Sequence, residues 1–219
     1  MKKKNLKFVS LLLCFLIASP LVWAEDDWQY WNMFQIKSDL SEKWSWRIFT
    51  EEWLNEDFSN LYLTNVDTGL TWKPSRYFSL GGFYRYQYVS PKNGDSTSEN
   101  RYYPELTFFL PTKHFKFSDR TRFQYHDTNR RTHFWSFRNK FQISYPTKIK
   151  ELPVTPYVYN ELFYHTGTGS INENRAGVGV SFKLSSRIDL ALYYQVRNTR
   201  KRADWQSAEI LGTMWTLKI

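Results

Sequence analysis

Charged residues that alternate with uncharged ones are the part of this sequence best suited to chemistry. At every second position of an extended segment they share one face, where they can pair with one another or attract ions of opposite charge. In our assignment, ten basic and five acidic residues occupy such faces. They are Arg47, Glu51, Asp67, Arg85, Arg101, Glu105, Arg120, Arg122, Arg138, Lys140, Glu161, Arg175, Lys183, Asp189 and Arg197. The pattern predicts either a lattice of ion pairs or a passage that favours anions.

The histidines do not have the spacing that a catalytic site would need. An enzymatic barrel requires a nucleophile and a base at fixed spacing, usually a histidine with a serine two positions on, near the rim. His126 is followed at this spacing by Thr128, and His133 by Trp135. We therefore predict no enzymatic activity and assign no catalytic, cofactor-binding or metal-binding residue. A lipid-modifying enzyme remains the less favoured alternative.

The elements that position these charges are predicted to be strands. From residue 28 onward the sequence alternates with period two in segments of about 10 to 13 residues, which is the strand pattern. Residues 135–145 illustrate the two faces. One face holds Trp135, Phe137, Asn139, Phe141, Ile143 and Tyr145; the other holds Ser136, Arg138, Lys140, Gln142 and Ser144. We therefore expect an all-β protein in which one face of each strand is apolar and the other is polar.

Three features favour a membrane barrel over a soluble sandwich or a lipocalin-like barrel. The segments match the roughly 9–11 residues with which a tilted strand crosses a bilayer. Aromatic residues, which make up 19% of the sequence, recur at the ends of the apolar faces, as in the girdles of outer-membrane barrels. The connections also alternate between short turns, as at residues 74–77, and longer polar segments, as at 55–60, 90–100, 166–173 and 199–204. The sequence thus predicts a transmembrane, up-and-down antiparallel β-barrel of 10–12 strands.

The strand count leaves the first segment ambiguous. Eleven segments have the strand pattern, whereas bacterial barrels favour even numbers with both chain ends on the periplasmic side. Either residues 28–37 are not a wall strand, which gives ten strands, or one strand has escaped notice, which gives twelve. The sequence does not decide between these alternatives.

The first 24 residues are predicted to be a Sec signal peptide that is cleaved after Ala24. Lys2, Lys3, Lys4 and Lys7 precede a short apolar core, and small residues follow it. Residues 25–219 would then form one barrel domain in the outer membrane of a Gram-negative cell. Cys14, the single cysteine, lies within the signal. Disulfides and cysteine-based metal sites are therefore excluded, and nucleic acid is an unsuitable partner for an exported protein.

The expected partners follow from this location. Outer-membrane lipids surround the barrel, and basic residues at 130–131 and 200–202 could contact lipopolysaccharide. The alternating face from Leu211 to Ile219 resembles the terminal sorting strand that the barrel-assembly machinery recognises, although it ends in Ile219 and not in an aromatic residue. A monomer is expected, and a small anionic solute is what an arginine-lined pore would pass.

Several short phrases carry a resemblance to a known family. They are Glu99-Asn100-Arg101, Arg120-Thr121-Arg122-Phe123, Phe137-Arg138-Asn139, the run from Pro156 to Phe163, and the run from Asn174 to Gly179. In this order the sequence resembles the exported bacterial proteins grouped as domain of unknown function 2490. The resemblance implies an outer-membrane barrel in which Arg101, Arg120, Arg122, Arg138, Glu161 and Arg175 point inward as a paired set. It implies no activity and no substrate.

The leading functional interpretation is a non-enzymatic, porin-like outer-membrane barrel with a narrow, anion-preferring pore lined by arginine and glutamate. A closed structural or surface-interaction barrel without transport is the alternative. The state of the lumen separates the two, because a continuous water path favours transport and a filled interior favours the closed barrel.

Overall fold

The computed structural model describes residues 28–130, 132–201 and 204–219, without the side chain of Lys201. The predicted signal peptide, Arg131 and Arg202 therefore lie outside the described residues. Twelve strands make up the described fold. They are β1 (Trp28–Asp39), β2 (Trp44–Asn55), β3 (Asn60–Ser75), β4 (Phe78–Val89), β5 (Thr97–Pro111), β6 (Lys116–Thr128), β7 (His133–Ser144), β8 (Thr147–Ile149), β9 (Leu152–His165), β10 (Ser170–Lys183), β11 (Ile188–Lys201) and β12 (Asp204–Lys218). Within the described ranges, no helix is long and apolar enough to cross a membrane.

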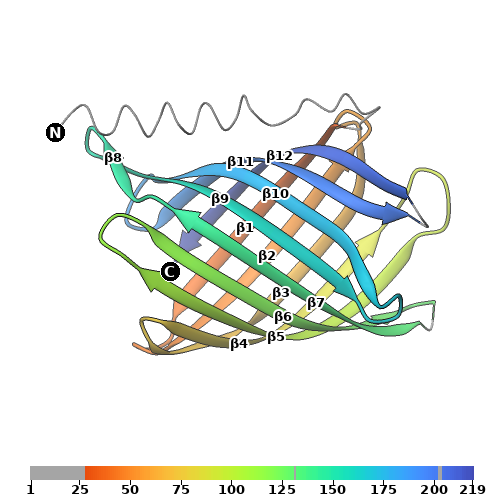
Figure 1. Cartoon of the computed structure of the whole chain (residues 1–219), viewed down its shortest axis with the longest axis horizontal. Helices are drawn as coiled ribbons and strands as arrows, with labels where there is room; N and C mark the ends of the chain where they lie inside the picture. The colour runs from red at the N-terminus through yellow and green to blue at the C-terminus, as the bar shows by residue number, and fades with distance from the viewer. Residues whose placement is uncertain (1–27, 131, 202–203) are drawn as a thin grey trace.

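The strands close into a single β-barrel (Figure 1). Each wall strand pairs with the next along the chain, and β7 pairs with β9. The three-residue β8 pairs only with the start of β9, so it forms a small hairpin at one end of the barrel. The wall therefore consists of eleven strands, within the predicted range of ten to twelve.

A parallel pairing between β1 and β12 closes the barrel. The register runs from Trp28 opposite Glu209 to Lys37 opposite Lys218, and all other pairings are antiparallel. Residues 28–37 are thus a wall strand, and β8 is the one strand that the sequence pattern missed. Because β8 lies outside the closed ring, the described wall has neither ten nor twelve strands. An odd number also places Trp28 and Ile219 at opposite ends of the barrel, here named the amino end and the carboxyl end.

The predicted contrast between tight turns and long loops is wrong. At the amino end, residues 97–100 and 170–173 and the start of β12 belong to strands, so the connections there, such as 56–59, 90–96 and 166–169, are shorter than predicted. Those at the carboxyl end have similar lengths. Polar residues in these segments suggested loops, but their backbone groups continue the ladder, as in the pairing of Val89 with Thr97.

Aromatic packing fills part of the interior near the amino end. The rings of Trp31 and Trp53 stack with centroids 3.7 Å apart and an interplanar angle of 4°. Leu63 and Ile210 complete this buried cluster. The cluster joins β1, β2, β3 and β12, so it packs directly inside the parallel closure and helps to hold it.

Gly69 marks a close contact between neighbouring strands, and its substitution is our first prediction. A Cβ atom on Gly69 would overlap the carbonyl oxygen of Gly82 and the ring of Phe83, and it would lie 2.9 Å from Cα of Phe83. Backbone atoms in paired strands cannot shift without a cost in free energy. Gly69→Ala should therefore lower the free energy of unfolding by about 1–3 kcal/mol. Urea titration in detergent, followed by tryptophan fluorescence, measures the change.

Gly82→Ala is the matched control, because a Cβ on Gly82 meets no atom within 4 Å. Its unfolding midpoint should stay within error of the unaltered protein. Equal losses in the two variants would contradict the packing argument.

Candidate functional site in the barrel lumen

Charged side chains form a layer across the middle of the lumen, here named the central belt. Its members point into the lumen from neighbouring strands of the wall. They are Arg47 and Glu51 on β2, Asp67 on β3, Arg85 on β4, Glu105 on β5, Arg120 and Arg122 on β6, Arg138 on β7, Glu161 on β9, Glu173 and Arg175 on β10, and Arg197 on β11. Burial of so many charges is tolerated only when they are paired and hydrogen-bonded.

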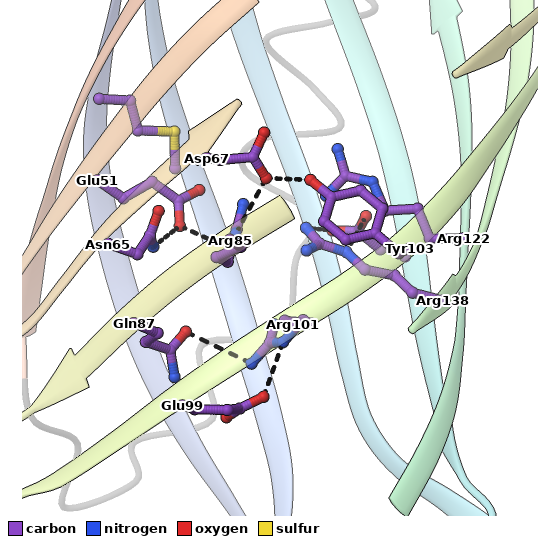
Figure 2. A network of polar contacts seen from close by, with 12 residues as sticks. Glu51, Asn65, Asp67, Arg85, Gln87, Glu99, Arg101, Tyr103, Arg122 and Arg138 are labelled. Atoms are coloured by element: carbon purple, nitrogen blue, oxygen red, sulfur yellow. Dashed lines mark hydrogen bonds and ion pairs between the residues drawn. The ribbon is translucent and has the colours of Figure 1, made fainter. Parts of the chain in front are cut away.

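Asp67 is the centre of the first part of the belt. Its carboxylate accepts a hydrogen bond from the hydroxyl of Tyr103 and ion-pairs with Arg85 at 3.2 Å and Arg47 at 3.5 Å. Arg85 also reaches Glu51 at 3.3 Å. Figure 2 shows Arg85 between the two carboxylates. Since Asp67 is fully buried, its charge depends on these donors.

Glu161 is the centre of the second part. Arg138 donates to both carboxylate oxygens, at 2.7 and 2.9 Å, and Arg120 donates at 2.8 Å. This two-pronged geometry gives strong, oriented binding of a carboxylate. Arg120 also lies 4.0 Å from Glu105, which pairs with Arg122 at 2.6 Å. Arg120 therefore connects the two parts of the belt.

A third part lies against the tryptophan pair. Glu173 binds Arg175 at 2.5 Å and Arg197 at 2.8 Å. The guanidinium of Arg175 lies 4.8 Å from the ring centroid of Trp31 and 5.2 Å from that of Trp53. Cation–π contacts thus carry the belt from β10 across to β1 and β2.

The belt separates two cavities. The carboxyl-end chamber, of about 150 Å³, is lined by Met33, Phe49, Lys140, Tyr159 and other residues. The amino-end chamber, of about 220 Å³, is lined by residues that include Glu99, His126 and Ser136. Arg85, Arg138 and Arg175 border both. These three arginines therefore lie where the two chambers meet.

The structure does not bring all the sequence-predicted residues together. Arg101 faces the amino-end chamber and binds Glu99 at 2.9 Å. Lys140 lies over the ring of Tyr159 in the carboxyl-end chamber. Lys183 and Asp189 lie apart from the belt at the carboxyl end of the barrel, where Asp189 pairs with Lys218 at 2.5 Å. The remaining predicted residues belong to the belt.

Two inward-facing carboxylates, the buried Glu173 and the half-buried Glu99, were missing from the sequence assignment. Glu173 was placed in a loop, and Glu99 was noted only in a short phrase. Each lies two positions before an inward arginine, Arg175 or Arg101, so extending the period-two pattern would have found both. With them, the fifteen assigned residues, ten basic and five acidic, become ten basic and seven acidic. The positive surplus that suggested an anion pore is correspondingly smaller.

Fold and site together define a class of protein, namely a closed β-barrel with a charged, internally paired lumen. The family model described as "Protein of unknown function (DUF2490)" matches residues 28–208. The chain belongs to this family, as the sequence phrases indicated.

Comparisons with other proteins add little. No curated protein matches the chain. Among solved structures, the crystal structure of the siderophore receptor PirA from Pseudomonas aeruginosa is similar, with 10% sequence identity and a TM-score of 0.26. The match covers 74% of this chain and only 32% of the receptor. A likeness at this level carries no inference about function.

Proposed function

We propose that the protein is exported, with residues 1–24 as its signal peptide, and resides in the outer membrane of a Gram-negative cell. The support is an inside-out distribution of residues. Outward side chains between 38% and 54% exposed include Phe34, Leu70, Leu80, Tyr86, Phe108, Phe123, Phe141, Leu162, Leu192 and Leu211. An apolar surface of this extent fits lipid, and the closed ladder leaves no backbone edge in hydrocarbon. Outer-membrane lipids and lipopolysaccharide would then be its partners, with the barrel-assembly machinery acting during biogenesis.

Polar residues interrupt the apolar exterior at several places, and at these places they bond one another, as Asn174 does with Asn160. At the seam, Thr213 donates to Asn32 at 3.1 Å, and Asn32 donates to Glu52 at 3.2 Å. On β6 and β7, Asn139 donates to Asp119 at 2.5 Å. Polar groups facing lipid are costly unless they have such partners, so this mutual bonding is compatible with a membrane position.

Within the membrane, we propose a closed monomeric barrel and not an open, anion-preferring pore. The observation that carries this choice is the layer of paired arginines, Arg85, Arg138 and Arg175, which lies where the two chambers meet. The guanidinium groups are held by buried carboxylates, so they are not free to bind a passing solute. The charged groups of the belt therefore pair with one another and not with a solute.

Conductance tests this proposal. Purified protein in a planar bilayer should show no steady single-channel steps, because the belt blocks the lumen. The double variant Glu51→Ala with Arg85→Ala removes a pair whose charges lie 3.3 Å apart, and we expect it to produce small steps. Lys92→Ala, in an exposed pair, should remain silent. Steady anion-selective steps in the unaltered protein would replace the closed barrel by the pore.

A further inference from the structure

Three side chains in the amino-end chamber have the arrangement of a hydrolytic site. Ser136 Oγ lies 2.7 Å from His126 Nε2, and His126 Nδ1 is hydrogen-bonded to the carboxylate of Glu99. The residues come from β7, β6 and β5, and His126 and Ser136 are buried. We propose that Ser136, His126 and Glu99 form a serine hydrolase site for a small ester that carries an anionic group. This inference does not depend on whether the lumen conducts.

The hydrogen bonds set the direction of proton transfer. An ionised carboxylate can only accept, so His126 donates from Nδ1 to Glu99. The neutral imidazole then has its lone pair on Nε2, where it accepts the hydroxyl hydrogen of Ser136. A serine that gives its proton to an oriented histidine is the activated nucleophile of acyl-transfer enzymes.

Neighbouring groups hold this geometry in place. Arg101 donates from Nε to Glu99 at 2.9 Å, so it fixes the carboxylate that orients His126. The imidazole of His126 stacks on Phe134 with ring centroids 4.2 Å apart, and Phe134 stacks on His165 at 4.3 Å. The base is therefore fixed both by hydrogen bonds and by ring contacts.

Gln124 is placed to stabilise a developing oxyanion. It pairs in register with Ser136 across the β6–β7 ladder, and residues paired in this way have Cβ atoms about 4.5–5.5 Å apart. Its side chain is buried with 1% exposure, yet Nε2 has no hydrogen-bond partner among the described residues. A buried, unpaired amide donor beside a nucleophile is what an oxyanion hole requires.

The chamber limits the substrate. Trp53, Leu63, Phe134 and Phe163 supply apolar walls. Five arginines against two glutamates give the lining a net positive charge even with both glutamates paired. A cavity of about 220 Å³ is smaller than a typical drug-sized pocket and admits a short acyl group, not a fatty acyl chain. The chemistry of the walls thus fits a short-chain ester with a carboxylate or phosphate group.

The proposed reaction is hydrolysis in two steps. Ser136 Oγ attacks the ester carbonyl while its proton moves to His126 Nε2, and Gln124 donates to the resulting oxyanion. Collapse breaks the bond to the alcohol, which leaves with the proton from His126, and Ser136 carries the acyl group. Water then attacks the acyl group, gives a proton to His126, and releases a carboxylic acid as Ser136 regains its proton. The sum is ester plus water to acid plus alcohol.

A serine-reactive fluorophosphonate probe and 4-nitrophenyl esters test the site on full-length protein in detergent. The unaltered protein should be labelled and should hydrolyse 4-nitrophenyl acetate, mono-4-nitrophenyl succinate faster, and the palmitate ester not measurably. Ser136→Ala and His126→Ala should each lose about a hundredfold or more in hydrolysis. Ser144→Ala, another buried inward serine on β7, should be unaffected.

Glu99 is a positioning residue, so its variant needs a different readout. Glu99→Gln should lower kcat with little change in KM, because it alters the base and not the contact with substrate. Glu99→Asp should restore part of kcat. Each variant is first shown to be folded by its resistance to detergent unfolding without heating. The proposal fails if the unaltered protein and Ser136→Ala are labelled equally and hydrolyse the acetate ester at equal rates. Faster hydrolysis of the acetate than of the succinate ester would contradict the proposed preference for an anionic substrate.

Discussion

Glu161→Ala is expected to destabilise the barrel by about 3–5 kcal/mol, because it leaves buried cations without their carboxylate. Arg138 binds both oxygens of Glu161 and, among the described residues, has no other ion-pair partner. Arg120 would keep only Glu105, at 4.0 Å. The loss is large because the desolvation of two guanidinium groups is no longer offset.

Urea titration in detergent micelles, followed by the fluorescence of the nine tryptophans after residue 24, measures this loss. Lys92→Ala is the control: Lys92 pairs with Glu56 at 2.6 Å but is exposed, so its removal should cost no more than about 1 kcal/mol. The double variant Glu161→Ala with Arg138→Met should recover part of the stability, since it removes one stranded charge. A loss below 1 kcal/mol for Glu161→Ala would show that the belt is not needed for folding.

Period-two alternation made the barrel and the inward charges predictable. Each side chain in a strand must face either the lumen or the exterior. The position of Arg85 or Glu161 in the alternating pattern is therefore enough to show that its side chain faces the lumen. The same rule cannot tell which inward residues meet. Arg47 reaches Glu105 from three strands away, and such contacts depend on the registers of all the pairings between them.

The proposed hydrolytic site shows most directly what sequence spacing cannot predict. A serine two positions after a histidine was sought on one strand, whereas Ser136 follows His126 by ten positions. The β6–β7 hairpin pairs His126 with Phe134, and this register places Ser136 diagonally beside His126 on the same face. Sequence spacing alone does not fix a hairpin register when the turn residues carry no strong turn motif.

The closure of the barrel was unpredictable for a related reason. Whether β1 joins the wall depends on whether it can pair with the edges of both β12 and β2. The sequence of β1 would alternate equally well inside the wall or outside it. In the structure β1 separates β12 from β2, pairing in parallel with the first and antiparallel with the second. A ten-stranded barrel would instead pair β12 with β2, so the two arrangements differ in which strands are neighbours.

Cysteine cross-linking distinguishes them with an all-or-none result. Cys14 lies in the proposed signal peptide, so the exported protein has no cysteine of its own. The pair Asn32→Cys with Thr213→Cys should form a disulfide almost completely under mild oxidation, because these residues are register partners whose side chains touch at 3.1 Å. The pair Glu52→Cys with Thr213→Cys should not form one, because β1 lies between them and adjacent strands are about 4.8 Å apart, which exceeds disulfide reach over two spacings. Migration on a non-reducing gel of the unheated and heated protein reads both outcomes. A Glu52–Thr213 cross-link in place of the Asn32–Thr213 cross-link would remove β1 from the wall, and with it the eleven-stranded barrel and the tryptophan pair that lines its seam.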